Sequence, residues 1–103
     1  MEIERGEAAA ELATEALSYV SEACRSPRLR SVCERLEDVL VAALDEAREI
    51  ELAPYVPRPP VAIEAAAREL EQAAREAEKM GLGEEASLLW EAARRLSMLA
   101  RIA

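Results

Sequence analysis

The sequence predicts an all-α fold: an antiparallel up-down-up-down four-helix bundle formed by a single domain, residues 1–103. Two observations carry this prediction. Apolar residues recur at intervals of three and four along most of the chain, which is the spacing of one face of an α-helix. Three short segments interrupt that pattern and divide it into helices near residues 3–25, 27–52, 60–80 and 84–102. Helices of such similar length suit a bundle of antiparallel neighbours.

Each of the three interruptions has a chemical reason. Ser26-Pro27 reads as an N-cap followed by proline at the first helical position. Four prolines between residues 54 and 60 forbid a helix and favour a stiff, extended crossing. Gly81-Leu82-Gly83 is a glycine stop, and the two glutamates after it are typical of a new helix start.

The first two predicted helices each carry apolar residues on one side and charged residues on the other. Placing successive residues 100° apart gathers these sets. On the first helix the apolar side holds Leu12, Ala13, Ala16, Leu17, Val20 and Cys24. On the second it holds Leu29, Val32, Leu36, Val39, Leu40, Ala43, Ala47 and Ile50.

The third predicted helix has an apolar side with almost no bulk. Because alanine side chains are short, this helix fills space only by packing very close to its neighbours. The predicted buried residues are Ile63, Ala66, Ala67, Leu70, Ala73, Ala74 and Ala77.

The fourth predicted helix is apolar over about half of its circumference, whereas a bundle helix needs a stripe only somewhat wider than about 100°. A second copy, a partner or the first helix would each cover the surplus, and singly exposed leucines are also common. We predict a homodimer through this helix. Its apolar anchors would be Leu88, Trp90, Met98 and Leu99.

Composition excludes several classes of function. The net charge is −8, and residues 1–53 hold 13 acidic and 6 basic residues, so we expect no nucleic-acid partner. The absence of His removes imidazole metal sites and His-based catalysis, and we expect no enzyme, metal or cofactor. No apolar run reaches about 20 residues, and the N-terminus is acidic where a signal peptide would be basic. We expect a cytosolic or recombinant soluble protein with no membrane contact.

The cysteine pair, Cys24 and Cys33, admits a disulfide or two free thiols. With helices over 3–25 and 27–52, the two residues differ by roughly 7 Å along the hairpin axis, and a disulfide needs Cα atoms about 4.4–6.8 Å apart. A bond would therefore require the first helix to fray or the two helices to be offset. We favour two buried free thiols that act as small hydrophobes.

Arginines cluster around the predicted start of the second helix and form a candidate anion site, with Arg25, Arg28 and Arg30 as its residues and Arg35 nearby. They also oppose the dipole of that helix, as do the glutamates at its far end. Interhelical charge matching is the favoured explanation. It places Glu78, Glu84 and Glu85 beside the start of the helix and Arg58, Arg68 and Arg101 near its end.

A small-molecule pocket is the main alternative function. In a bundle with 22 alanines, a few polar groups around a cavity would bind a small apolar ligand. The candidate residues are Tyr19, Trp90 and Ser97.

Residues 62–103 resemble a helical hairpin of the tetratricopeptide type, which the microtubule-interacting-and-transport domain also uses. The matching positions are Leu70, Ala74, Ala77, Gly81, Ala86, Trp90 and Ala93. This resemblance implies binding of a peptide or partner helix, although one hairpin cannot form a tetratricopeptide groove unaided. The whole chain also looks like a de novo designed helical bundle, because Ala, Glu, Leu and Arg dominate and the helix stops are well placed.

The sequence therefore predicts a non-catalytic structural or self-associating bundle, with helix 4 as the contact surface. The alternatives are a small-molecule-binding bundle and a helical-hairpin adaptor for a partner helix.

Overall fold

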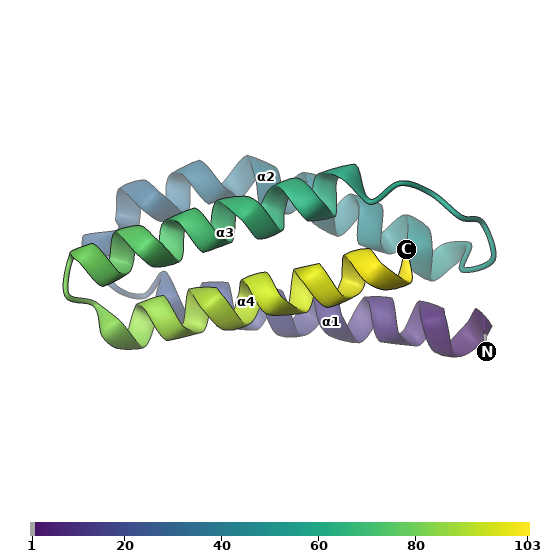
Figure 1. Ribbon diagram of the computed structural model, residues 1–103, viewed down its shortest axis with the longest axis horizontal. Helices are drawn as coiled ribbons and strands as arrows, with labels where there is room; N and C mark the ends of the chain where they lie inside the picture. Colours follow the sequence, from purple (N-terminus) through teal and green to yellow (C-terminus); the bar gives the residue numbers. More distant parts are fainter. Residues whose placement is uncertain (1) are drawn as a thin grey trace.

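The computed structural model describes residues 2–103, with side chains from Arg5 onward. Within that range the helices follow one another in alternating directions, and the start of α1 lies at the same end of the bundle as the end of α4 (Figure 1). The elements are α1 Glu2–Ala23, a 3₁₀ turn Pro27–Leu29, α2 Arg30–Leu52, α3 Val61–Lys79 and α4 Gly83–Ile102. The predicted antiparallel four-helix bundle is confirmed.

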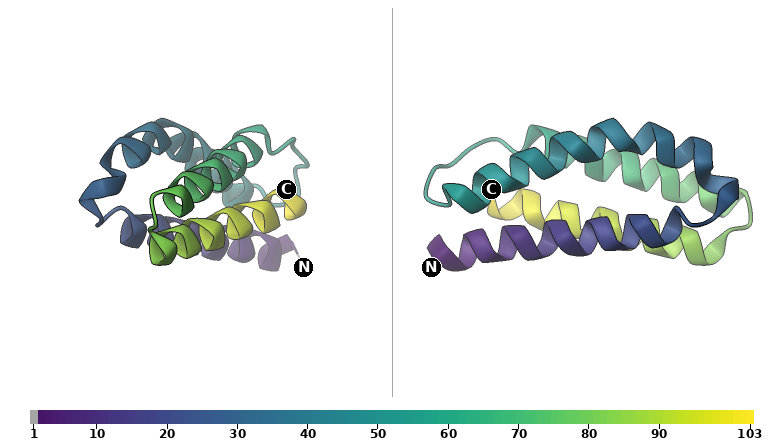
Figure 2. Two further views of the ribbon diagram at one scale, coloured as in Figure 1. Left: turned by 60° about the vertical axis from the view of Figure 1, so that its left-hand side comes forward. Right: turned by 180° about the vertical axis from the view of Figure 1, so that it is seen from behind.

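The four helices form two layers, with α1 beside α4 and α2 beside α3 (Figures 1 and 2). The most extensive contacts join α4 to α3 and α4 to α1, whereas α1 and α2 touch least among neighbouring helices. The bundle measures 42 × 19 × 17 Å. The α1–α2 side is therefore its most loosely closed side.

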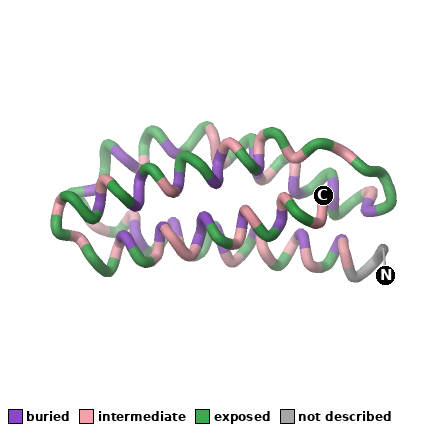
Figure 3. The backbone as a smooth tube through the Cα atoms, in the orientation of Figure 1, coloured by how far each residue is buried: buried purple, intermediate pink, exposed green. Residues whose placement is uncertain are grey.

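The core is apolar and rich in alanine. No polar or charged side chain is buried among the described residues, and the buried positions face inward on every helix (Figure 3). Eight large aliphatic side chains supply the bulk: Leu29, Leu36, Ile50, Ile63, Leu70, Leu89, Leu96 and Leu99. Most of the other buried residues are alanine, so each large side chain carries a large share of the apolar burial.

The apolar side of α3 matches the sequence-based prediction residue for residue. Its buried residues are Ile63, Ala66, Ala67, Leu70, Ala73, Ala74 and Ala77. Short side chains let α3 approach both α4 and α2, which are its neighbours in the bundle.

Replacing Ala74 by Leu is expected to destabilise the bundle by about 1–3 kcal/mol. Ala74 is 0% exposed, so the added atoms must displace packed neighbours. Urea unfolding followed by circular dichroism measures the change. Ala42→Leu is the matched control, because Ala42 is exposed on α2 and such changes shift stability by less than about 0.5 kcal/mol. Equal stability of the two variants would contradict close packing of α3.

The apolar side of α1 differs from the prediction at Leu17. Its buried residues are Ala9, Ala13, Ala16, Val20 and Ala23. Leu17, predicted to be in the core, is 42% exposed and lies on the side of α2. The reason is that α1 packs mainly against α4, so small residues face the core and Leu17 lies over the looser α1–α2 side.

A glutamate side chain caps the start of α3, and a glycine turn ends the helix. The Glu46 carboxylate of α2 accepts hydrogen bonds from the backbone N–H groups of Ala62 (3.2 Å) and Ile63 (2.9 Å), which satisfies two of the free donors at a helix start. At the other end, Gly81 has φ +78° and the Leu82 N–H donates to the Ala77 carbonyl at 2.9 Å. This is the glycine stop that the sequence predicted.

Cys24 and Cys33 form a disulfide, so the prediction of two free thiols is wrong. Their Cα atoms are 6.1 Å apart. The helix bounds explain the difference: α1 ends at Ala23, and the 3₁₀ turn delays the start of α2 to Arg30. Cys33 therefore lies in the first turn of α2, and the expected axial mismatch with Cys24 disappears.

Candidate functional site

One of the four residues of the predicted interface on α4 is buried in the core. Leu99 is 0% exposed, so its assignment as an exposed anchor is wrong. Leu88 and Trp90 are half-buried, and Met98 is 42% exposed. The wide apolar side of α4 is covered from two directions by α1 and α3, which are its two most extensive contacts. Its width therefore reflects a central position in the bundle.

The three predicted pocket residues do not share a pocket. Tyr19 lies on the α1–α4 side, where its ring contacts the Arg95 guanidinium at 5.1 Å. Trp90 lies on the α3–α4 side, with Arg75 5.5 Å from its ring and its Nε1 donating to Glu78 at 3.2 Å.

Ser97 lines a separate, open hollow of about 380 Å³ between α3 and α4. Most of the lining side chains there are charged or short: Glu64, Ala67, Arg68, Glu71, Ala100 and Arg101. An apolar ligand would find no enclosed, apolar space of the kind that such ligands need.

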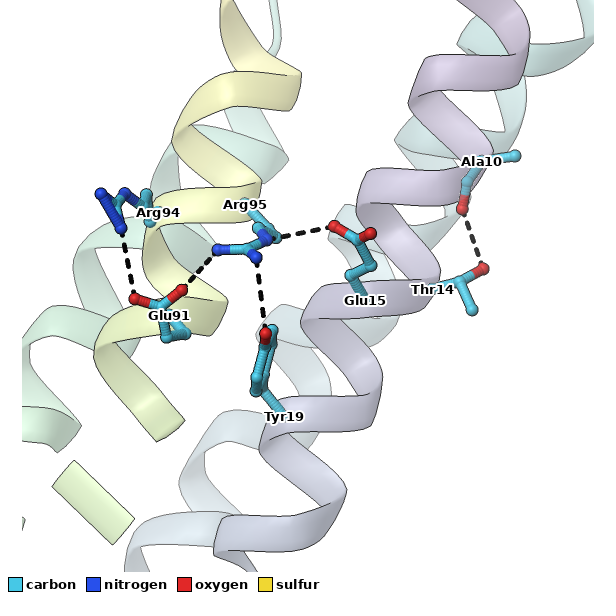
Figure 4. A network of polar contacts seen from close by, with 7 residues as sticks. All are labelled: Ala10, Thr14, Glu15, Tyr19, Glu91, Arg94 and Arg95. Atoms are coloured by element: carbon cyan, nitrogen blue, oxygen red, sulfur yellow. Dashed lines mark hydrogen bonds and ion pairs between the residues drawn. The ribbon is translucent and has the colours of Figure 1, made fainter. Parts of the chain in front are cut away.

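Arg95 links α4 to α1 through a network of polar contacts (Figure 4). It donates to Glu91 at 2.6 Å, to Glu15 at 3.1 Å and to the Tyr19 hydroxyl at 3.4 Å. The hydrogen bond from Arg95 lowers the pKa of Glu91, and the bonds to Glu91 and Glu15 raise the pKa of Arg95. The network holds the two helices together.

Replacing Arg95 by Gln is expected to lower the melting temperature at pH 7 more than at pH 3. Because the Arg95 hydrogen bond lowers the pKa of Glu91 below the usual value for a glutamate, the contribution of Glu91 to stability is present above that usual value and is lost as the pH falls through the lowered pKa. Thermal unfolding at both pH values measures the difference. Arg68→Gln, at an exposed position, is the control. An equal deficit at both pH values would contradict the role of the Glu91 contact.

The predicted anion site is split between two surfaces. Arg28 donates to the Met80 carbonyl at 3.2 Å, and Arg35 pairs with Glu76 at 2.7 Å, so both face α3. Arg25 and Arg30 instead line a hollow between α1 and α2. The structure does not bring Arg25, Arg28 and Arg30 together around one anion.

Charge matching accounts for part of the reversed polarity of α2. Glu49 near its end pairs with Arg58 at 2.6 Å, as predicted. At its start the acidic partner is Glu76, whereas the predicted Glu78 bonds Trp90. Arg68 and Arg101 line the α3–α4 hollow and do not match the end of α2.

A surface that the prediction missed runs along α1 and α2. Three open hollows of about 430, 450 and 470 Å³ follow one another between these helices. The first two share Ala10, Glu51 and Leu52. The third begins about one helical turn further on, at Val20 and Leu40. Together they extend from the end of α2 to the disulfide.

We call this surface the α1–α2 face. Several large apolar side chains are exposed along it: Leu52 (73%), Tyr55 (68%) and Leu17 (42%). Val41 (54% exposed) lines none of these hollows, but its spacing of three residues from Leu44 and seven from Arg48 places it on the same side of α2, and we include it in the face. Its apolar members are Leu17, Leu40, Val41, Leu44, Leu52 and Tyr55.

The described part of the chain contains neither a candidate metal site nor a candidate membrane-spanning helix. Residues 5–103 contain no group of three or more metal-ligating side chains. None of the described helices has the length and apolar character needed to cross a membrane.

Comparison with protein-family models, curated proteins and solved structures finds no match for the chain. The α3–α4 pair does form a hairpin with Gly81 in its turn, but its likeness to tetratricopeptide hairpins stays a prediction. The likeness to a de novo designed bundle also stays a prediction.

Proposed function

We propose that this chain is a non-catalytic structural module that self-associates through the α1–α2 face. The observation that carries the proposal is the run of exposed apolar side chains along the side of the bundle where neighbouring helices touch least. Apolar surface arranged along one face favours association, because covering it removes it from water. The contact surface thus moves from α4, where we predicted it, to α1 and α2.

Apolar and charged side chains are interspersed along this face, and its most exposed apolar residues, Leu52 and Tyr55, lie at one end. Leu17, Leu40, Val41 and Leu44 lie in the middle of the two helices. Charged side chains line both ends, among them Arg30 at one and Glu51 at the other.

The size of the face also suits an interface. A long side of the bundle measures 42 by 19 Å, an area on the order of 800 Å², which is what one partner contributes to a standard-size interface. This is the outline of a whole side of the bundle, so it is the upper limit of the area that the α1–α2 face contributes to a dimer.

Sedimentation equilibrium from micromolar to millimolar concentration tests the proposal. We expect a dimer whose dissociation constant rises more than about tenfold in Val41→Glu, because each dimer would bury two added charges. Val61→Glu is the matched control, since Val61 is 64% exposed at the start of α3 and lies off the face. A monomer throughout, or equal weakening by both variants, would reject the proposal.

A further inference from the structure

The outer side of α2 carries a second stripe at helical spacing, distinct from the one that faces the core. Its members alternate at intervals of four and three residues, which places them on one side of the helix. They are Arg30, Glu34, Glu37, Val41, Leu44, Arg48 and Glu51. Apart from Val41, which is 54% exposed, all of them line the hollows of the α1–α2 face.

Four of the five charges of this stripe have opposite signs at matching distances on the two sides of Val41, and the fifth, Glu37, has no basic counterpart. Arg30 lies eleven residues before Val41 and Glu51 ten residues after it, which is about 15–17 Å on each side at 1.5 Å per residue. Glu34 and Arg48 lie seven residues before and after it, or about 10 Å on each side. At both distances a basic residue on one side corresponds to an acidic residue on the other.

These four charges have no partner within the described chain. No hydrogen bond or ion pair joins the side chains of Arg30, Glu34, Arg48 or Glu51 to residues 5–103. The charges on the other side of α2 differ in this respect. Arg35 and Glu49 are paired, as described above, and the Glu46 carboxylate caps α3.

We infer that the occupant of the α1–α2 face is a second copy of the chain, packed antiparallel about a two-fold axis that passes near Val41. In this arrangement Arg30 lies opposite Glu51 of the second copy, and Glu34 lies opposite its Arg48. The axis repeats each contact, because a two-fold interface joins the same surface of both copies. The inference rests on the proposed function and adds the orientation and the residues that set it.

A parallel pair would place each charge beside its own copy. Arg30 would then face Arg30 and Glu51 would face Glu51, which is repulsive at both ends. A basic partner helix is less well matched than a second copy, since it would meet Arg30 and Arg48 as well as the glutamates. The opposite charges at matching distances from Val41 are thus best matched by the same stripe in reverse.

Reversing the charge at either end of the stripe, or at both ends together, tests the antiparallel orientation. The variants are Arg30→Glu, Glu51→Arg and the double variant, measured as dimer dissociation constants at low salt. We expect each single variant to raise the dissociation constant about tenfold, since two ion pairs become two repulsions. The double variant restores both pairs, so we expect a wild-type value. Glu34→Arg, Arg48→Glu and their double variant should behave in the same way.

Net charge alone predicts a different outcome, which makes Glu51→Arg the decisive variant. It reduces the negative charge of the chain and would strengthen a dimer limited by general repulsion, whereas antiparallel pairing requires that it weaken the dimer. Both single changes improve the match between α2 and its helix dipole, so a lost dimer does not reflect a lost fold. Circular dichroism of each variant is the measurement that checks whether the helical fold is retained.

The two proposals fail in different ways. A monomeric wild-type protein would overturn self-association and the orientation together. A wild-type dimer that is disrupted by Val41→Glu but strengthened by Glu51→Arg, or not restored in the double variant, would overturn only the antiparallel arrangement. A dimer insensitive to every change on α2 would place the interface elsewhere and overturn both.

Discussion

Leu99→Glu is expected to unfold the bundle. Leu99 is 0% exposed on α4, the helix with the two most extensive packing contacts. The substitution removes a buried aliphatic side chain, at a cost of about 2–5 kcal/mol, and adds the cost of burying a carboxyl group without a partner. A loss of more than about 4 kcal/mol is a large part of the roughly 5–15 kcal/mol of unfolding free energy that stabilises a small domain. Circular dichroism at 25 °C and a urea titration measure the loss.

Met98→Glu is the control for this change. Met98 is the neighbouring residue on α4 and is 42% exposed, so its substitution by Glu should leave the helical spectrum intact and shift stability by less than about 1 kcal/mol. A folded but monomeric Leu99→Glu protein would support the predicted dimer through α4 and would contradict the burial of Leu99.

Sequence periodicity predicted well where a helix has one dominant set of small residues. All seven residues predicted to be buried on α3 are buried, because alanine at helical spacing leaves one direction for close packing. On α1 the same reasoning failed for Leu17. Alanines lie on several sides of that helix, and periodicity does not say whether α2 or α4 packs more closely against it. Leu17 is exposed for that reason.

The exposure of Leu99 on α4 was predicted wrongly for a related reason. The width of an apolar face reports how much surface must be covered, and it does not say by how many neighbours. On α4 the covering elements are α1 and α3, both within the chain. The outer stripe of α2 was present in the sequence as a regular spacing. It was overlooked because the prediction searched for apolar residues and most members of this stripe are charged.

The disulfide shows the limit set by helix boundaries. Proline at residue 27 predicted the start of an α-helix, and the chain forms a 3₁₀ turn there first. A shift of three residues in the start of α2 decided whether Cys24 and Cys33 meet. Boundaries are uncertain by that amount when the turn between two helices is unknown.

Removing the disulfide is expected to lower the stability of the bundle by about 2–3 kcal/mol, because the bond closes a loop of roughly ten residues in the unfolded chain. The Cys24→Ala/Cys33→Ala double variant should therefore melt roughly 10–20 °C below the oxidised wild type. The fold should persist, since neither cysteine belongs to the fully buried part of the core. Differential scanning calorimetry measures the change.

Reductant provides the matched control for the same bond. Adding it should lower the melting temperature of the wild type by a similar amount and leave that of the double variant unchanged, because only the wild type has a bond to reduce. Intact-protein mass spectrometry should show the oxidised wild type lighter by two hydrogens. If the wild type keeps both thiol hydrogens without reductant, or melts at the same temperature with and without it, Cys24 and Cys33 are not bonded. Persistence of the bond in cells would favour an oxidising compartment, which makes its redox state informative beyond stability.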